Sequence, residues 1–385
     1  MKRTGLVLVV CCLLLGAFPL GAAAADLNVA GKSAVLMDTA TGTVIYESGA
    51  HEQLAPASVT KVMTMLLIME AIDSGKISWD DTVTASEAAA AKGGSQIYLK
   101  VGETMTVSDM VKSIAVSSAN DCACAMAEHL AGSEEAFVQQ MNTRAKELGM
   151  NDTNFVNCTG LDDAPEAAEH KTSAYDIAIM SRQLLKNHPD IKKFTTIWMD
   201  TVRDGAFGLS NTNKMVRFYS GCTGLKTGFT SGAGYCLSSS AERDGMELIA
   251  VVMGSQTSQE RFAACKSMLD YGFANYTVYT PALQEDAAVS VELGKTGTVK
   301  AVPAEATSLL VEKGQLSSVT SDITLEENVT APVSKGQRLG MLTVKAGEQV
   351  LSQIPLVAET GVERKTWGDL FVDLLRQVAM AKPKT

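Results

Sequence analysis

The feature of this sequence that most constrains its fold is an apolar stretch directly after Pro56-Ala57-Ser58. Between Ser58 and about Ile72, hydrophobic residues occupy every face of a helix: Val59, Val62, Met63, Met65, Leu66, Leu67, Ile68 and Met69. A helix that is apolar on all sides has to be covered by protein on all sides. The sequence therefore predicts a buried central helix with Ser58 at its N-terminus.

The segments around this helix indicate a mixed domain. Residues 34–46 read as a hairpin, because β-branched and aromatic residues flank turn-forming residues at 38–42. Helical patterns follow near 86–92, 107–116, 120–131, 134–148 and 173–186, then strand-like runs at 235–240 and 248–254, and a helix at about 258–271. Strands at both ends of a helical middle predict one α/β domain over residues 26–275, with a sheet assembled from distant segments.

The composition changes beyond about Tyr276. Short Val- and Thr-rich runs separated by turn residues occur at 288–293, 298–303, 323–326 and 338–344, and predict a small all-β domain over residues 276–363. Residues 364–385 contain an amphipathic helix, about 366–381, with Trp367, Leu370, Phe371, Leu374, Leu375 and Val378 on one face. Aromatic residues on that face and basic flanks favour attachment to a membrane surface, with packing against the β domain as the alternative.

The first 25 residues have the parts of a secretory signal peptide. Lys2 and Arg3 precede an apolar run that ends in Ala23-Ala24-Ala25, which predicts cleavage before Asp26 and an exported protein. A retained membrane helix is the alternative, but the run is short. The formal net charge of −10 becomes −12 once Lys2 and Arg3 are removed, which makes nucleic acid a poor partner.

The cysteines and histidines do not predict a metal site or a cofactor. The cysteines after the signal are Cys122, Cys124, Cys158, Cys222, Cys236 and Cys265. Only one residue separates the first two, and the four histidines show no ligand spacing. An even count in an exported protein is compatible with disulfides, but the sequence cannot pair them and a chain this long does not need them. We interpret them as small buried thiols, with a redox role for Cys122, Cys158 and Cys222, which lie close to the motifs described below, as the alternative.

A candidate nucleophile stands at the start of the buried helix. Ser58 is followed by Lys61, which lies nearly one helical turn later and therefore on the same face. A serine hydroxyl needs a base to become nucleophilic, and a lysine whose pKa is lowered by burial can be that base. The helix N-terminus would present N–H groups to a developing oxyanion. A capping serine beside a surface lysine is the alternative.

Two further motifs follow in order. Ser118-Ala119-Asn120 offers a hydroxyl and an amide for proton relay and amide recognition, or else a simple helix cap. Lys226-Thr227-Gly228 offers a lysine and a hydroxyl for a carboxylate, and a glycine that permits close approach. A second Lys-Thr-Gly, at residues 295–297, is interpreted as a turn. Ser-x-x-Lys, Ser-x-Asn and Lys-Thr-Gly together form the motif set of β-lactamases and penicillin-binding proteins.

On these residues the chain resembles, over essentially its whole length, the low-molecular-mass penicillin-binding proteins of the D-alanyl-D-alanine carboxypeptidase type. Residues 157–161, 170–176, 211–214, 224–230 and 233–237 also look like segments of that family. The resemblance implies a transpeptidase-like α/β domain, with an antiparallel sheet and a helical subdomain. A small β domain and a C-terminal amphipathic helix that anchors the protein to the membrane surface would follow.

The resemblance also implies a reaction. Ser58 would be acylated by the penultimate D-Ala of a peptidoglycan stem peptide, releasing the terminal D-Ala, and β-lactam antibiotics would acylate the same serine. Lys61 would be the base and Ser118 the proton relay. The substrate-binding residues would be Asn120 for the peptide amide, Lys226 and Thr227 for the terminal carboxylate, Gly228 on the same strand, and Phe229 with Ser58 for the oxyanion through their N–H groups.

Three other functions fit parts of this pattern. A serine β-lactamase shares the motifs, but the extra β domain and anchor argue against it. A non-catalytic penicillin-binding sensor or scaffold is disfavoured because the motif residues are intact. A Ser-His-Asp hydrolase is disfavoured because no Gly-x-Ser-x-Gly surrounds Ser58.

Overall fold

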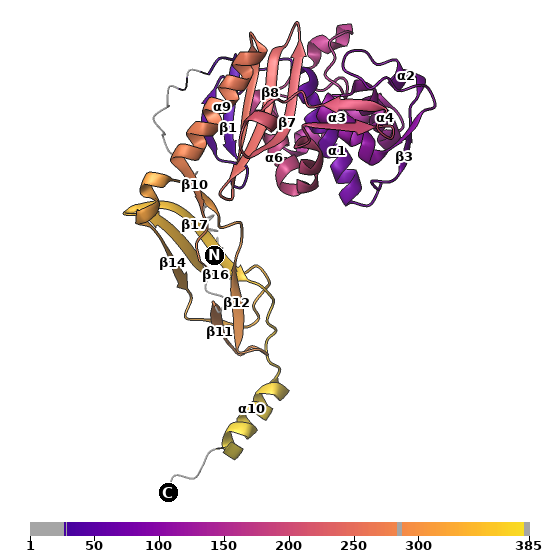
Figure 1. The fold of residues 1–385 in the computed structure, drawn as a ribbon. Helices are drawn as coiled ribbons and strands as arrows, with labels where there is room; N and C mark the ends of the chain where they lie inside the picture. The colour runs from indigo at the N-terminus through magenta and orange to yellow at the C-terminus, as the bar shows by residue number, and fades with distance from the viewer. Residues whose placement is uncertain (1–26, 28, 283–286, 381–385) are drawn as a thin grey trace, which may run out of the picture.

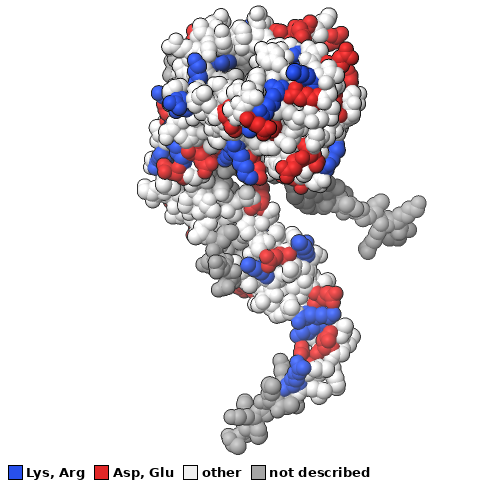
Figure 2. Space-filling model, turned by 45° about the vertical axis from the view of Figure 1, so that its right-hand side comes forward, with Lys and Arg blue, Asp and Glu red and all other residues white. Residues whose placement is uncertain are grey.

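The computed structural model describes residues 27, 29–282 and 287–380. It shows a body of sheet and helices, then an elongated β-rich body, then a terminal helix at the far end (Figure 1). The expected signal peptide, residues 1–25, lies outside the described residues. On the face in Figure 2, basic and acidic side chains are intermixed and form no continuous basic surface.

The first body is built on a five-stranded antiparallel sheet in the order β2-β1-β9-β8-β7. Its strands are β1 (Ser33–Asp38), β2 (Val44–Ser48), β7 (Cys222–Thr230), β8 (Gly234–Arg243) and β9 (Met246–Ser255). The expected hairpin at 34–46 is confirmed as β1 and β2, and strands from both ends of the helical middle meet where β1 pairs with β9. β7 is an edge strand of this sheet, so the third motif pairs with a neighbouring strand on one side only.

Helices cover both faces of this sheet (Figure 1). On one side lie α1 (Lys61–Asp73), α2 (Glu87–Ala90), α3 (Val107–Ser117), α4 (Asn120–Ala131), α5 (Glu134–Glu147), α6 (Ala174–Asn187) and α7 (Lys192–Thr195). On the other, α9 (Ser258–Asn275) packs against β8 and β9. Successive side chains of β1 point to opposite faces of the sheet. Val35 and Met37 are therefore part of the hydrophobic core around α1, while Leu36 is part of the core under α9.

The buried central helix is confirmed, with one correction at its start. Nine of the thirteen residues of α1 are buried, and α3, α4, α5 and α6 surround it. The regular helix begins at Lys61, because residues Ala57–Thr60 form a 3₁₀ turn, η1. Ser58 therefore lies in the 3₁₀ turn and not in the first turn of the α-helix.

Short elements that the sequence did not predict complete this body. They are the hairpins β3 (Thr82–Thr84) with β4 (Thr104–Thr106) and β5 (Met199–Val202) with β6 (Phe207–Ser210), helix α8 (Met215–Phe218), and the 3₁₀ turns η2 (Pro165–Glu169) and η3 (Pro189–Ile191). Each is too short to carry a periodic pattern of its own.

The second body has its own hydrophobic core around a six-stranded sheet in the order β14-β16-β17-β12-β11-β15. The strands are β11 (Ala288–Glu292), β12 (Thr298–Pro303), β14 (Val319–Leu325), β15 (Asn328–Thr330), β16 (Arg338–Ala346) and β17 (Gln349–Ala358). A separate pair, β10 (Tyr276–Tyr279) and β13 (Leu309–Glu312), lies near the junction, followed by the 3₁₀ turn η4 (Lys313–Ser318). Residues 295–297, the second Lys-Thr-Gly, lie in the bend between β11 and β12, as expected.

The terminal helix α10 (Trp367–Met380) is present where the amphipathic pattern predicted it. Its apolar face is not packed on the β-rich body, since Trp367 is 89% exposed and Phe371, Leu374 and Leu375 are also exposed. Within the described residues, no helix combines the length and apolar character needed to cross a bilayer.

Candidate active site

Ser58 and Lys61 are in direct contact. The Lys61 Nζ donates hydrogen bonds to Ser58 Oγ at 3.0 Å and to the carbonyl of Thr159 at 2.8 Å. The Lys61 side chain is 0% exposed. Burial penalises its ammonium form and lowers the pKa of Lys61 to about 7. A large share of this lysine is therefore neutral near pH 7, as a base for Ser58 would have to be.

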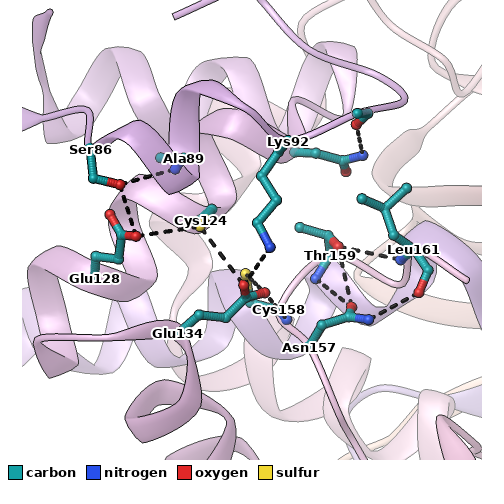
Figure 3. Close-up of polar contacts among 12 residues, drawn as sticks. Ser86, Ala89, Lys92, Cys124, Glu128, Glu134, Asn157, Cys158, Thr159 and Leu161 are labelled. Atoms are coloured by element: carbon teal, nitrogen blue, oxygen red, sulfur yellow. Dashed lines mark hydrogen bonds and ion pairs between the residues drawn. The ribbon is translucent and has the colours of Figure 1, made fainter. Parts of the chain in front are cut away.

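The second partner of Lys61 comes from a turn that the sequence did not single out as part of the site. The Asn157 Oδ1 accepts hydrogen bonds from the N–H groups of Thr159 and Gly160, at 3.1 and 2.6 Å. Its Nδ2 donates to the carbonyl of Leu161 at 2.9 Å (Figure 3). One amide side chain thus shapes the turn that presents the Thr159 carbonyl to Lys61.

The same turn supports the residue before Ser58. Ala57 has a φ of +47°, which is unfavourable for a residue with a Cβ. Gly160, with a φ of +81°, lies so close that a Cβ there would be 1.8 Å from the Ala57 carbonyl oxygen. Only glycine allows this contact, and the contact helps to hold Ala57 in its strained conformation.

Ser118 and Asn120 lie between α3 and α4. Ser118 ends α3 in a left-handed conformation, with a φ of +64°, and Asn120 is the first residue of α4. The Asn120 Nδ2 donates to the carbonyl of Gly93 at 2.7 Å. Both residues are buried, yet Ser118 Oγ and Asn120 Oδ1 have no hydrogen-bond partner among the described residues. Because the cap of α4 makes no side-chain hydrogen bond, the alternative of a simple helix cap is wrong here.

Lys226, Thr227 and Gly228 lie on β7, directly against η1. A Cβ on Gly228 would be 2.6 Å from the Pro56 carbonyl oxygen and 3.1 Å from Ser58 N, so the first and third motifs meet at this glycine. The Lys226 Nζ donates to the Thr227 carbonyl at 2.9 Å, and Thr227 Oγ1 donates to Thr212 Oγ1 at 2.7 Å.

Lys226 is the second buried lysine of the site. Burial lowers its pKa well below the ordinary range, and the positive charges of Lys61 and Arg261 lower it further. Phe229 follows on β7, is 52% exposed, and stacks on Tyr235 with ring centroids 4.3 Å apart. The structure therefore brings the first and third motifs into contact. Asn120 of the second motif lies near the Thr159 turn, because a Cβ on Gly94 would be 2.9 Å from Asn120 Nδ2 and 3.2 Å from Leu161 Cδ2.

Arg261 is a residue of this region that sequence reasoning missed. It reaches from α9, where its Nη1 donates to the carbonyls of Gly228 at 2.9 Å and Cys236 at 3.2 Å. The buried guanidinium thereby ties β7 to β8. It belongs to no sequence motif. Its partners are backbone carbonyls of residues distant in sequence, and these cannot be identified without the tertiary structure.

A partly buried polar cluster lies beside the turn at Thr159. Glu134 pairs with Lys92 at 2.5 Å, and its Oε1 accepts from the N–H and Sγ of Cys158, at 3.1 and 3.2 Å (Figure 3). Cys124 Sγ lies 3.9 Å from the other carboxylate oxygen.

All the cysteines of the described region are free, and all but Cys222 are fully buried, which supports their interpretation as small buried thiols. Among the described residues, no group of three His, Cys, Asp or Glu side chains lies close enough together to hold a metal ion.

A cavity of about 600 Å³ adjoins the site. Its walls include Gly93, which binds Asn120, and Thr159, which binds Lys61. Lys92, Asn157 and Leu161 are also part of the lining. A second cavity of about 600 Å³, between α8 and α9, is lined by none of the site residues.

This fold, with the three motifs brought together on it, is that of the penicillin-binding class of serine enzymes. Residues 21–257 match the D-alanyl-D-alanine carboxypeptidase family, Peptidase S11, and residues 277–364 match the C-terminal domain of penicillin-binding protein 5. The chain therefore belongs to the D-alanyl-D-alanine carboxypeptidase family of low-molecular-mass penicillin-binding proteins. The family expected from the sequence is confirmed, and with it the carboxypeptidase activity.

Individual relatives agree over most of the chain. It is 45% identical to the D-alanyl-D-alanine carboxypeptidase DacF of Bacillus subtilis, over 89% of each protein. It is 34% identical to DacC of Escherichia coli, over 87% of this chain and 85% of the relative. The crystal structure of penicillin-binding protein 5 from Haemophilus influenzae matches with a TM-score of 0.77 and 30% identity, over 87% of this chain and 98% of that one.

Proposed function

We propose that Ser58, Lys61 and Ser118 carry out the carboxypeptidase reaction, and that Asn120, Lys226, Thr227, Gly228 and Phe229 bind the substrate. The observation that carries this assignment is the 3.0 Å contact of Ser58 Oγ with a fully buried lysine whose pKa is about 7. A lysine that is largely neutral at working pH can take the serine proton as Oγ attacks.

The reaction begins with the penultimate D-Ala carbonyl of a peptidoglycan stem peptide. Ser58 Oγ attacks its carbon while Lys61 accepts the proton, and the oxyanion forms at the N–H groups of Ser58 and Phe229. Ser118 gives its hydroxyl proton to the leaving amine and takes one back from the Lys61 ammonium, which releases the terminal D-Ala. Water then attacks the acyl carbon and one of its protons returns to Ser58 Oγ, which hydrolyses the acyl-enzyme. The unpartnered Ser118 Oγ supports this relay, because no competing hydrogen bond holds it among the described residues.

Substrate binding follows from charge and hydrogen bonding. Asn120 Oδ1, which is also unpartnered, accepts from a peptide N–H, while Lys226 and Thr227 hold the terminal carboxylate. β-Lactam antibiotics acylate Ser58 in the same way and leave slowly. A similar solved structure, penicillin-binding protein D2 of Listeria monocytogenes in an ampicillin-bound form, supports β-lactam binding.

The test is release of D-Ala from a peptide that ends in D-Ala-D-Ala. Wild-type protein is expected to release free D-Ala, and Ser58→Ala none, while Ser290→Ala on β11 in the second body serves as the matched control. Release that survives Ser58→Ala would overturn the assignment. A labelled penicillin distinguishes the alternatives: slow, stable labelling supports a carboxypeptidase, and rapid hydrolysis supports a β-lactamase.

The chain organisation and location are proposed as follows. Residues 1–25 are a signal peptide, 26–275 the catalytic domain, 276–363 the β-rich domain, and 364–385 a helix that attaches the exported enzyme to the membrane surface. The exposed apolar face of α10, with Trp367 and Phe371, supports attachment. A protein ending at Glu363 should then fail to sediment with anionic lipid vesicles that retain the mature protein. Equal sedimentation of the two would contradict attachment through α10.

A further inference from the structure

A directed chain of hydrogen bonds runs from the 154–161 segment to the residue before the nucleophile, and it passes through His170. The imidazole is buried, 3% exposed, and follows the 3₁₀ turn η2. The N–H of Val156 lies 3.1 Å from His170 Nδ1, and His170 Nε2 lies 2.8 Å from Thr60 Oγ1. Thr60 Oγ1 in turn donates to the Ala57 carbonyl at 2.8 Å.

The chemistry of these groups fixes the direction of each bond. A backbone N–H can only donate, so Nδ1 must be the unprotonated nitrogen of a neutral imidazole. The proton is then on Nε2 and is donated to Thr60 Oγ1. Since that oxygen accepts from His170, its own proton is free to point at the Ala57 carbonyl.

The surroundings of His170 keep it neutral. Burial is the main cause that lowers the pKa of His170 to about 4, and the charges that act on it are the cations Lys171, beside it, and Lys61, from α1. Phe155 packs its ring edge-on against the imidazole at 5.7 Å. A protonated ring would set an Nδ1–H against the Val156 N–H, two donors facing each other.

The chain ends on the peptide unit that joins Ala57 to Ser58. A trans peptide is planar, with its C=O and N–H pointing in opposite directions, so fixing the Ala57 carbonyl also fixes the Ser58 N–H. That N–H is one of the two donors proposed above for the oxyanion. The strained φ of Ala57, +47°, means that local backbone preference does not hold this plane by itself.

We propose that His170 is a positioning residue that acts through Thr60 to hold the Ala57–Ser58 peptide plane, and so aims the Ser58 N–H at the reacting carbonyl oxygen. The inference rests on the proposed function of Ser58 as nucleophile. It predicts a particular kinetic effect. Loss of a hydrogen-bond donor that acts only in the transition state lowers kcat and leaves KM nearly unchanged.

The test compares two replacements that each keep one half of the imidazole. In His170→Gln the amide N–H₂ reaches the place of Nε2 and still donates to Thr60. In His170→Asn the amide oxygen takes the place of Nδ1 and still accepts from Val156, but Thr60 is left without its donor. We expect kcat for D-Ala release to fall about tenfold more in His170→Asn than in His170→Gln, with KM unchanged in both, since small misplacements near the reacting atoms have effects of this order.

A double-mutant cycle tests the route through Thr60. Thr60→Val, which removes the hydroxyl, should lower kcat about 10- to 100-fold, and Thr60→Ser should restore most of it. Adding His170→Asn to Thr60→Val should cause no further loss, because both changes break one chain. His188→Asn is the control: that histidine is also largely buried, but it pairs with Asp73 at the other end of α1.

Rates are counted per penicillin-labelled site, so that misfolded protein does not contribute. Equal losses in His170→Asn and His170→Gln, losses that multiply in the double variant, or a change in KM instead of kcat would each overturn the proposal. Failure of the proposed function would look different, because Ser58→Ala would then still release D-Ala in an otherwise wild-type protein.

Discussion

The burial of Lys61 leads to a prediction about pH. If Lys61 is the base, the acylation rate should follow its neutral fraction, and its pKa is about 7. The neutral fraction is then about one-eleventh at pH ~6 and about ten-elevenths at pH ~8. Acylation of Ser58 should therefore rise about tenfold between these two pH values.

The assay is rapid mixing with a saturating fluorescent penicillin, so that the rate constant of acylation is read without binding effects. Saturation matters because the pKa of Lys226 is also lowered by burial, which would weaken carboxylate binding at high pH. Lys61→Arg is the matched control, since a guanidinium keeps its proton at these pH values and the residual rate should lose the tenfold rise. A wild-type rate that is flat from pH ~6 to ~8 would refute the role of Lys61 as base.

The same lysine should affect stability with a definite sign. Its pKa in the folded protein, about 7, lies below the ordinary value of 10.5, so the native state binds fewer protons than the unfolded state between these values. The free energy of unfolding should therefore rise with pH in that window, by about 1.4 kcal/mol per pH unit from this group alone. Lys61→Met should remove this contribution, which urea unfolding at two pH values within the window can measure.

Three other outcomes are expected. Gly160→Ala should destabilise the protein by more than ~2 kcal/mol in thermal unfolding, because its Cβ would collide with the Ala57 carbonyl. Gly132→Ala is its matched control: Gly132 is also at positive φ but has open space around it, so the substitution should cost only about 1 kcal/mol. Asn157→Ala should slow penicillin acylation, because the turn that holds the Thr159 carbonyl against Lys61 loses its hydrogen bonds. In a thiol-reagent assay, the buried cysteines should react only after unfolding, since burial raises the pKa of Cys236 to about 11 and the thiolate is the reactive form.

Much of the fold could be predicted from the sequence wherever a hydrophobic pattern extended over enough residues to indicate a helix or a strand. The helix after Ser58, the hairpin at 34–46 and the amphipathic α10 all carry such patterns, and all are present. β17 was missed, although it is ten residues long, because many of its positions are only half-buried and Pro355 interrupts it. The alternation of burial that identifies a strand is present only in its last five positions.

The site likewise has parts that could be predicted from the sequence and parts that could not. Side chains that are proposed to act through their own functional groups, such as Ser58, Lys61 and Lys226, could be identified from motifs. The Thr159 carbonyl could not, because every residue carries a backbone carbonyl and only tertiary structure selects one. The position of Ser58 in a 3₁₀ turn was also missed, since contacts from Gly160 and Thr60 hold the strained Ala57 beside it.

The lack of partners at Ser118 Oγ and Asn120 Oδ1 has an energetic consequence. Both atoms are buried without a protein partner among the described residues, and leaving a buried polar atom without a hydrogen bond costs about 1–3 kcal/mol. If Asn120 binds the substrate as proposed, a peptide N–H that reaches its Oδ1 recovers that cost. A ligand of the same shape that lacks this N–H does not recover it, so the proposed site would select for ligands that carry the N–H.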